Sequence, residues 1–231
     1  MFITDFHSHI LPLMDDGSKS VEESLEMLRM LSGQSVKRVI ATPHFYANDE
    51  TVDKFLKRRE EAYQKLVSAI DFDTPEIVLG AEVKFYDGIS RLDGLDKLSI
   101  QNSNMLLLEM PISTWSEYTV NELISIASSG NRTLVLAHVE RCLDLQKKDL
   151  PRKLSANGIL MQMNAEFLFR FFSKRKAFRL IKNNFVQFIG SDCHSTTERP
   201  PNIEKGFEVM KKHLGKAFVE ELVDFGNGMF L

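Results

Sequence analysis

The strongest constraint on the fold is a regular alternation of short apolar segments with longer amphipathic segments. Between the short segments, apolar residues recur with the spacing of an α-helix, which predicts repeated units of a strand followed by a helix. Seven runs have the length and apolar content of buried strands, at about 3–7, 36–42, 76–81, 105–109, 133–138, 158–163 and 185–190. Helical patterns occupy about 20–31, 50–70, 116–129, 144–156, 166–183, 201–214 and 216–225.

Two local signals mark helix ends. Ser20 with Glu23 three residues later predicts a capping box at the start of the first helix, and Gly226 and Gly228 predict the end of the last one. Repeated strand–helix units imply a parallel sheet. Seven units in 231 residues favour a distorted (β/α)7 TIM-like barrel, with an open doubly wound α/β sheet as the alternative. Because no repeat, linker or low-complexity tract divides the chain, we expect one domain over 1–231.

Composition narrows the class of protein. The net charge of −3 gives no global attraction to nucleic acid or to an anionic membrane, so a phosphorylated substrate must be held locally. The N-terminus lacks the features of a signal peptide, and no apolar stretch is long enough to span a bilayer. The two cysteines, Cys142 and Cys193, form no CxxC motif. We therefore expect a cytoplasmic protein without inserted membrane segments or a nucleic-acid partner.

Chemically active residues gather where the predicted strands end, which is where both candidate architectures place their sites. Five of the six histidines lie there, and the sixth, His213, fits the last turn of a helix and needs no functional role. A lone histidine at a strand end is usually only a hydrogen-bonded loop residue, but histidines and carboxylates at six strand ends together point to a site. Glu109 follows a fully apolar run and should therefore face a positive charge.

These residue types suit a catalytic metal site. Nitrogen and carboxylate ligands without cysteine fit Mn, Fe or Zn in an open site. Because a catalytic metal usually takes three or four protein ligands, so many candidates predict two or three ions. The nine candidate ligands are His7, His9, Asp16, His44, Glu82, Glu109, His138, Asp192 and His194.

Clustered divalent cations suit phosphoester hydrolysis, because they activate water and neutralise phosphate charge. Arg141 and Arg199 follow two of the candidate ligands closely and could add bidentate contacts to phosphate, although ordinary surface arginines would read the same. Phe45, Tyr46, Phe85, Tyr86 and Trp115 follow strands and could either flank the mouth of the site or pack in the core.

The motifs that carry these residues resemble the PHP (polymerase and histidinol phosphatase) superfamily. Within it, the segments around Asp16, Glu109 and Arg141 are similar to bacterial manganese-dependent tyrosine-protein phosphatases encoded with capsular or exopolysaccharide genes. The motifs read His7-Ser8-His9, Thr42-Pro43-His44, Gly80-Ala81-Glu82, Ala137-His138 and Gly190-Ser191-Asp192-Cys193-His194.

The resemblance implies a distorted (β/α)7 barrel, three metal ions on the nine ligands, and Mn²⁺ as the first choice of metal. It also implies phosphate binding by Arg141 and Arg199, a metal-activated water as nucleophile, and the phosphotyrosine-bearing tail of a bacterial tyrosine kinase as substrate. Val139 replaces a proline typical of the group, Cys193 replaces a small residue, and the stretch before the seventh strand is short. Histidinol-phosphate-type hydrolysis, nuclease activity and a non-catalytic binding module remain alternatives, and the oligomeric state is open.

Overall fold

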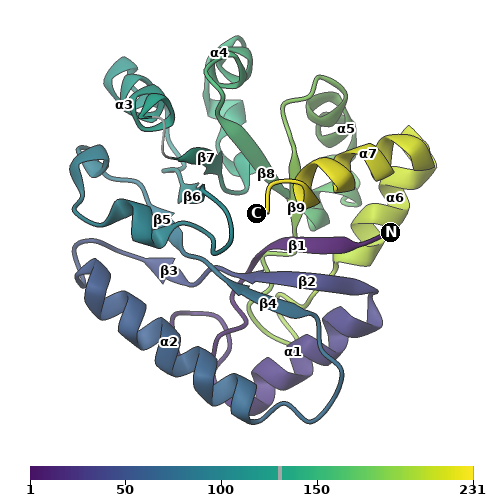
Figure 1. Ribbon diagram of the computed structural model, residues 1–231. Coiled ribbons are helices and arrows are strands. Elements are labelled where there is room, and N and C mark those ends of the chain that lie inside the picture. The colour runs from purple at the N-terminus through teal and green to yellow at the C-terminus, as the bar shows by residue number, and fades with distance from the viewer. Residues whose placement is uncertain (130–131, 231) are drawn as a thin grey trace.

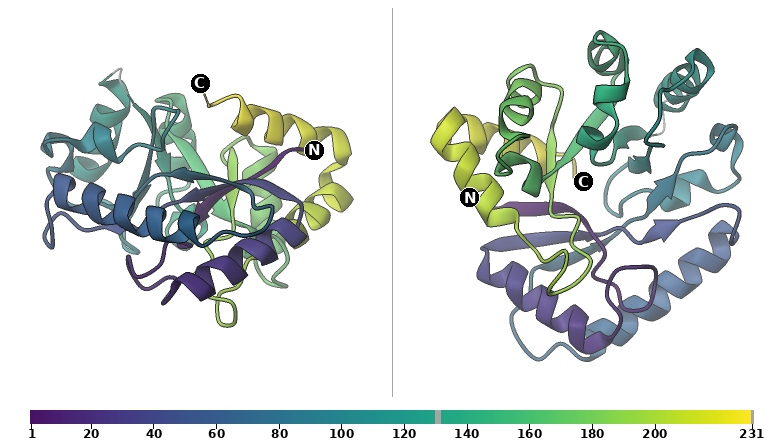
Figure 2. Two further views of the ribbon diagram at one scale, coloured as in Figure 1. Left: turned by 60° about the horizontal axis from the view of Figure 1, so that its bottom comes forward. Right: turned by 180° about the vertical axis from the view of Figure 1, so that it is seen from behind.

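The computed structural model describes residues 1–129 and 132–230. Its strands form a curled, all-parallel arrangement with α-helices on the outside (Figures 1 and 2). The strands are β1 (Ile3–Ser8), β2 (Val36–Ala41), β3 (His44–Phe45), β4 (Glu76–Leu79), β5 (Glu82–Lys84), β6 (Met105–Glu109), β7 (Thr133–Leu136), β8 (Leu160–Asn164) and β9 (Phe188–Gly190). The α-helices are α1 (Val21–Gly33), α2 (Val52–Ser68), α3 (Glu117–Ser128), α4 (Leu150–Ala156), α5 (Lys174–Lys182), α6 (Ile203–Leu214) and α7 (Lys216–Asn227).

The second and third predicted strands, 36–42 and 76–81, are present as β2 and β4, but each is followed by a further short strand, β3 or β5, that was not predicted. Pro43, which has no N–H to donate, lies in the break between β2 and β3, and Gly80 lies in the break between β4 and β5. The breaks lie side by side, because β2 pairs with β4 and β3 pairs with β5. The amide of Gly80 still donates to Ala41 O at 2.8 Å, so the neighbouring strands stay together through the bend. The sheet is thereby divided into β1-β2-β4 and β3-β5-β6-β7-β8-β9.

The last strand returns to the first. An isolated parallel bridge joins Ser8 to Cys193, and the amide of Asp192 donates to His7 O at 2.8 Å. The strands therefore curl round as seven successive units, as the sequence predicts for a distorted (β/α)7 barrel. The alternative of an open doubly wound sheet is wrong.

The predicted strand-then-helix order fails in the third unit. Between β5 and β6 the chain forms two short 3-10 helices, Ile89–Arg91 and Leu95–Leu98. Each follows a glycine with positive φ, Gly88 (95°) or Gly94 (76°), a conformation that breaks a continuous α-helix. The last strand is instead followed by two helices, α6 and α7.

Two other predicted helices are too long. The helix expected over 144–156 begins only at Leu150, and Pro151 lies in its first turn, where the missing N–H does no harm. The helix expected over 166–183 is divided into a 3-10 helix, Ala165–Leu168, and α5, which starts at Lys174.

The cap at the start of α1 is confirmed, whereas one of the two predicted stops is not. Ser20 accepts a hydrogen bond from the Glu23 amide at 3.2 Å. Gly228 caps α7, but Gly226 lies within that helix, where a Cβ atom would come within 2.8 Å of the Phe6 ring. Gly226 thus permits close packing of α7 on β1.

Apolar side chains from the strands form a buried cluster, against which Phe230 packs. The cluster includes Phe6, Ile40, Leu107 and Phe188. Polar residues concentrate where the strands end at their carboxyl termini. No helix in the described ranges has both the length and the apolar character needed to cross a membrane.

Candidate metal centre and active-site cleft

Glu82, fully buried at the start of β5, lies at the centre of the histidine cluster. Its Oε2 atom is 3.1 Å from His7 Nε2, 3.3 Å from His9 Nε2 and 3.0 Å from His44 Nδ1. Its Oε1 atom is 2.7 Å from His138 Nε2. One carboxylate therefore touches four imidazoles that come from three different strand units, an arrangement suited to a ligand that bridges metal ions.

Asp16 approaches this cluster from the first loop. Its Oδ1 atom is 3.5 Å from both His44 Nε2 and His194 Nε2, while its side chain is 66% exposed. His9, Asp16, His44 and His194 present ligand atoms within 4.8 Å of one another. Asp16, one of the nine candidate ligands, therefore lies beside two of the candidate histidines.

Glu109 closes the other side of the cluster. Lys84 Nζ lies 2.9 Å from its Oε2 atom, and His138 Nε2 lies 3.8 Å from its Oε1 atom. The expectation that a positive group faces this carboxylate is confirmed. His44, Glu82 and Glu109 form one group of possible metal ligands, and His7, His9 and Glu82 form another.

Asp192 joins the histidines to the two arginines. Its Oδ1 atom is 3.6 Å from the Nε2 atoms of both His7 and His9, and 3.7 Å from His194 Nδ1. Its Oδ2 atom accepts hydrogen bonds at 2.5 Å from both Arg141 and Arg199. The nine predicted ligands and both predicted arginines therefore lie in one connected cluster.

The donor set fits divalent metal ions. His44 Nδ1, Glu82 Oε2 and His194 Nε2 are buried and lie within 3.5 Å of other ligand atoms of the cluster, yet none of the three has a partner with hydrogen-bond geometry. Burying such atoms unpaired is unfavourable, so they call for a bound group. Imidazole and carboxylate ligands without a thiolate match an open Mn, Fe or Zn site.

Charge balance in the cluster also favours cation binding. Burial of His9 disfavours its protonated form, but the neighbouring carboxylates of Asp15 and Glu82 outweigh this effect and raise the pKa of His9 to about 10. Burial likewise opposes ionisation of Glu82, but the surrounding histidines hold its pKa well below the usual range. The protein alone thus holds protons at positions that metal ions would occupy, and metal binding should release them.

Two of the candidate ligands have unusual backbone conformations. His138 has φ 29° and Asp192 has φ 54°, although neither is a glycine. Each follows the end of a strand, β7 or β9, where the sharp turn directs the side chain toward the cluster. Conformations of this kind cost about 1–3 kcal/mol each and are concentrated at functional sites.

Sequence reasoning missed the residues that orient the ligands. Asp15 Oδ2 is 2.7 Å from His9 Nδ1 and accepts from the His44 amide at 2.8 Å. Gln162 Oε1 is 3.2 Å from His7 Nδ1 and accepts from the His138 amide at 2.7 Å. The polar Gln162 within the apolar run of β8 was the available signal.

Asp15→Asn should weaken metal binding about 10–100-fold, the usual effect of losing an outer partner of a histidine ligand. An amide in place of the carboxylate no longer fixes the His9 tautomer that presents Nε2 to the cluster. Metal titration of the variant measures this, with Asp53→Asn, an exposed residue paired with Lys97, as the control. Unchanged metal affinity would show that Asp15 does not hold His9 in place.

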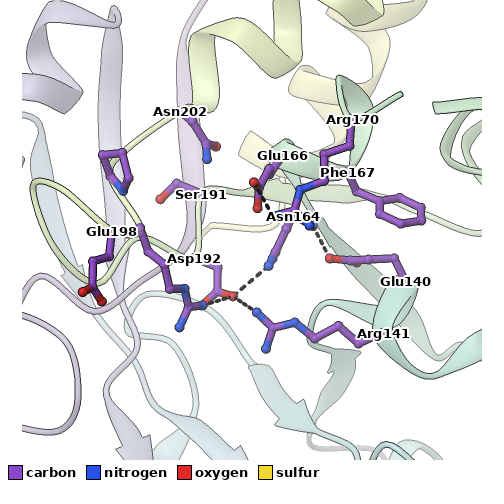
Figure 3. Close-up of a pocket in the computed structure, with 12 residues that line it drawn as sticks. Glu140, Arg141, Asn164, Glu166, Phe167, Arg170, Ser191, Asp192, Glu198 and Asn202 are labelled. Atoms are coloured by element: carbon purple, nitrogen blue, oxygen red, sulfur yellow. Dashed lines mark hydrogen bonds and ion pairs between the residues drawn. The ribbon is translucent and has the colours of Figure 1, made fainter. Parts of the chain in front are cut away.

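A cleft opens beside the arginine pair (Figure 3). Asn164 donates to Asp192 Oδ2 at 2.7 Å, so three donors converge on one carboxylate oxygen. The cleft has a volume of about 400 Å³, and Glu140, Phe167 and Arg170 form part of its wall. Donors that converge on one anionic oxygen beside a metal centre suit the binding of phosphate.

The five aromatic residues divide between core and surface. Phe45, Phe85 and Trp115 are buried in the core, and Tyr86 is partly buried and packs against it. Tyr46 is exposed, and its ring lies 5.3 Å from that of His44, at the edge of the metal cluster. Cys193 is fully buried, and burial raises the pKa of its thiol, so it is a filler of the interior and not a reactive group.

A curled α/β sheet with a His/Asp/Glu cluster at its strand ends defines the class of metal-dependent hydrolases with TIM-like barrels. The chain belongs to the CpsB/CapC family of capsular polysaccharide synthesis, whose model matches residues 3–230. It is 31% identical to the tyrosine-protein phosphatase YwqE of Bacillus subtilis, over 91% of this chain and 85% of that protein. It is 28% identical to the tyrosine-protein phosphatase CpsB of Streptococcus pneumoniae, over 94% of this chain and 93% of the relative.

Solved structures agree on the fold. A crystal structure from work on YwqE and CpsB, described as unique metal-dependent tyrosine phosphatases, superposes with a TM-score of 0.84 at 23% identity, covering 98% of this chain and 94% of that one. A phosphotriesterase homology protein from Escherichia coli, with phosphate in its active site, gives a TM-score of 0.52 at 12% identity, covering 99% and 98%.

Proposed function

We propose that this chain is a metal-dependent tyrosine-protein phosphatase that acts on the phosphotyrosine-bearing tail of a bacterial tyrosine kinase and so regulates capsular or exopolysaccharide synthesis. The observation that carries the proposal is the position of Asp192, with one oxygen toward the histidine cluster and the other held by Arg141 and Arg199. This contact supports the proposal, because two guanidinium groups that could bind phosphate lie directly beside candidate metal ligands. Family membership and the names of the relatives supply the substrate class.

In this proposal the nine clustered side chains hold two or three divalent ions, with Mn²⁺ first and Fe or Zn as alternatives. Ions bound there would lower the pKa of a water molecule and neutralise charge on phosphate. Glu82 would be shared between the ions, since its two oxygens face different sets of histidines. Asp16 supplies a ligand from the exposed side and can adjust as ions bind, because its side chain is largely in solvent.

The remaining residues bind and orient the substrate. Arg141 and Arg199 hold the phosphoryl oxygens, and Asn164 keeps Asp192 turned toward both. Tyr46 at the edge of the cluster offers a ring face for the phenyl group of the substrate. No cysteine nucleophile takes part, because both cysteines are buried and the pKa of each thiol is raised.

We also propose that residues 1–231 act as one catalytic domain in the cytoplasm, without a nucleic-acid partner. Two free, buried cysteines fit a reducing compartment.

The proposal is tested by metal analysis coupled to a phosphopeptide assay. Chelation should abolish turnover of a phosphotyrosine peptide and lower the melting temperature, and Mn²⁺ should restore both. A ligand present at 100 times its dissociation constant stabilises a protein by about 2.7 kcal/mol, which a thermal shift assay detects. Full turnover by the metal-free protein would refute the proposed chemistry.

The same assay separates the alternatives. Histidinol phosphate and single-stranded DNA are offered beside the phosphotyrosine peptide, and the peptide should have the highest kcat/KM. Preference for histidinol phosphate would leave metal-dependent phosphoester hydrolysis in place but overturn the substrate. A purified protein with no metal and no turnover would instead indicate a binding module.

A further inference from the structure

The segment between the 3-10 helix Ala165–Leu168 and α5 carries two neighbouring aromatic side chains that project into solvent. Phe171 is 89% exposed and Phe172 is 94% exposed, and their ring centroids are 5.1 Å apart. Two almost fully exposed phenylalanines side by side are unusual, because each leaves a large apolar surface in water. They therefore point to something that covers them.

The helix that follows is strongly basic on its outer face. Residues 167–191 contain six of the chain's 29 Lys and Arg and none of its 32 Asp and Glu. Arg175, Arg179 and Lys182 are exposed and spaced i, i+4 and i+7, so they form one stripe along α5. Phe171 stands one turn before the stripe.

The cations of this stripe are available for a partner. Arg170 and Lys176 have acidic partners, Glu166 at 2.6 Å and Asp144 at 2.5 Å. In the described ranges, Arg175, Arg179 and Lys182 form no ion pair. Together with Phe171 and Phe178 they line a shallow groove, whose far wall is His213 of α6, stacked on Phe178 at 4.7 Å.

We propose that Phe171, Phe172 and the basic stripe of α5 form a docking surface for an anionic lipid bilayer. Protruding rings beside a row of Lys and Arg match the interfacial mode of membrane attachment, in which rings enter the boundary of the acyl chains and cations contact acidic head groups. The complementary charge lies on the membrane. A second copy of this chain docked through the same surface would bring two positive stripes together. A peptide lying in the groove would leave Phe172 uncovered, because Phe172 does not line the groove.

Docking in this way would fix the orientation of the active site. Phe167 and Arg170 form part of the cleft wall beside Asp192 (Figure 3). Arg170 immediately precedes the two exposed rings, and Phe167 lies four residues before Phe171. The opening of the cleft would then lie close to the bilayer, favouring phosphoproteins held at the membrane. The proposal concerns a different surface from the metal cluster and does not depend on the identity of the substrate.

Vesicle co-sedimentation of the metal-loaded, full-length chain tests the proposal. The protein should bind vesicles of phosphatidylcholine mixed with phosphatidylglycerol, bind phosphatidylcholine alone much more weakly, and lose binding as salt is raised. The double variant Phe171→Ser/Phe172→Ser should bind roughly 100-fold more weakly, at about ten-fold per ring. Arg175→Glu/Arg179→Glu should lose at least about 25-fold, from about five-fold per cation removed.

Matched controls lie elsewhere on the surface. Tyr118→Ser removes an exposed ring from α3, and Lys57→Glu/Lys65→Glu makes the same charge change on α2. Both should bind as the wild type does, and all variants should keep their metal content and their turnover of a soluble phosphopeptide.

Three results would overturn the proposal. The first is absence of wild-type binding to anionic vesicles at low salt, and the second is undiminished binding by the Phe171→Ser/Phe172→Ser variant. The third is weak vesicle binding together with one of two other interactions that the variants abolish. These interactions are concentration-dependent self-association and tight binding of poly-glutamate. Self-association would assign the surface to a second copy of this chain, and poly-glutamate binding would assign it to an acidic protein.

Discussion

Glu82→Gln is expected to abolish phosphatase turnover and to empty the metal centre. The glutamine keeps the shape of the side chain but removes the negative charge that four histidines share. Loss of a direct bridging ligand should exceed the roughly 10–100-fold cost of losing an outer partner, for metal affinity and for kcat/KM. Elemental analysis and a phosphopeptide assay measure the two effects.

The matched control is Glu122→Gln. Glu122 is also a buried glutamate, but it accepts hydrogen bonds from the Gly88 and Ser90 amides, away from the cluster. This variant should lose some stability while keeping its metal and its activity. If Glu82→Gln retained a full complement of metal, Glu82 would be a structural carboxylate and not a ligand.

Arg141→Ala and Arg199→Ala should each lower kcat/KM by on the order of 10²–10³-fold, the range for removing one donor to developing charge. Metal content should stay near that of the wild type, because neither side chain is a ligand. The double variant should lose less than the product of the two single losses, since both guanidinium groups contact the same oxygen of Asp192. Steady-state kinetics with metal analysis separates these outcomes from a collapse of the metal site.

Two further variants sharpen the test. Arg141→Lys keeps the charge but loses the planar fork, so it should recover only part of the activity. Arg170→Ala removes a cation that lies in the wall of the same cleft but pairs with Glu166, and it should change kcat/KM by no more than about two-fold. Loss of metal in Arg141→Ala would mean that the arginine acts by holding Asp192 and not phosphate.

The metal cluster was predictable because of where parallel strands end. His7 and His9 lie two residues apart on one strand, and Glu109 and His138 follow apolar runs, so a strand-based interpretation brings them to one edge. Gln162 and Asp15 were not predicted, because nothing in the local pattern says which histidine nitrogen needs a partner. That depends on how the rings turn once the strands are assembled.

The fold was predictable in its repeat and less so in its connections. Apolar periodicity identifies strands and α-helices, but it indicates no helix between residues 81 and 105, where the structure has two short 3-10 turns between β5 and β6. Each of those turns follows a glycine with positive φ, Gly88 or Gly94. The sequence shows the glycines but not the sign of their φ angles. The short strands β3 and β5, which follow the breaks at Pro43 and Gly80, were likewise not predicted.

The amino-acid sequence by itself determined the seven strand units, the set of candidate ligands and the two arginines, since these depend on spacing and residue type along the chain. Only the tertiary structure decided how the ligands are arranged: that Glu82 touches four histidines, and that Asp192 faces the histidines with one oxygen and the arginines with the other. The physical reason is that these contacts join residues far apart in the sequence. Their geometry is set by the curl of the sheet and by the sharp turns at His138 and Asp192, and not by any local preference.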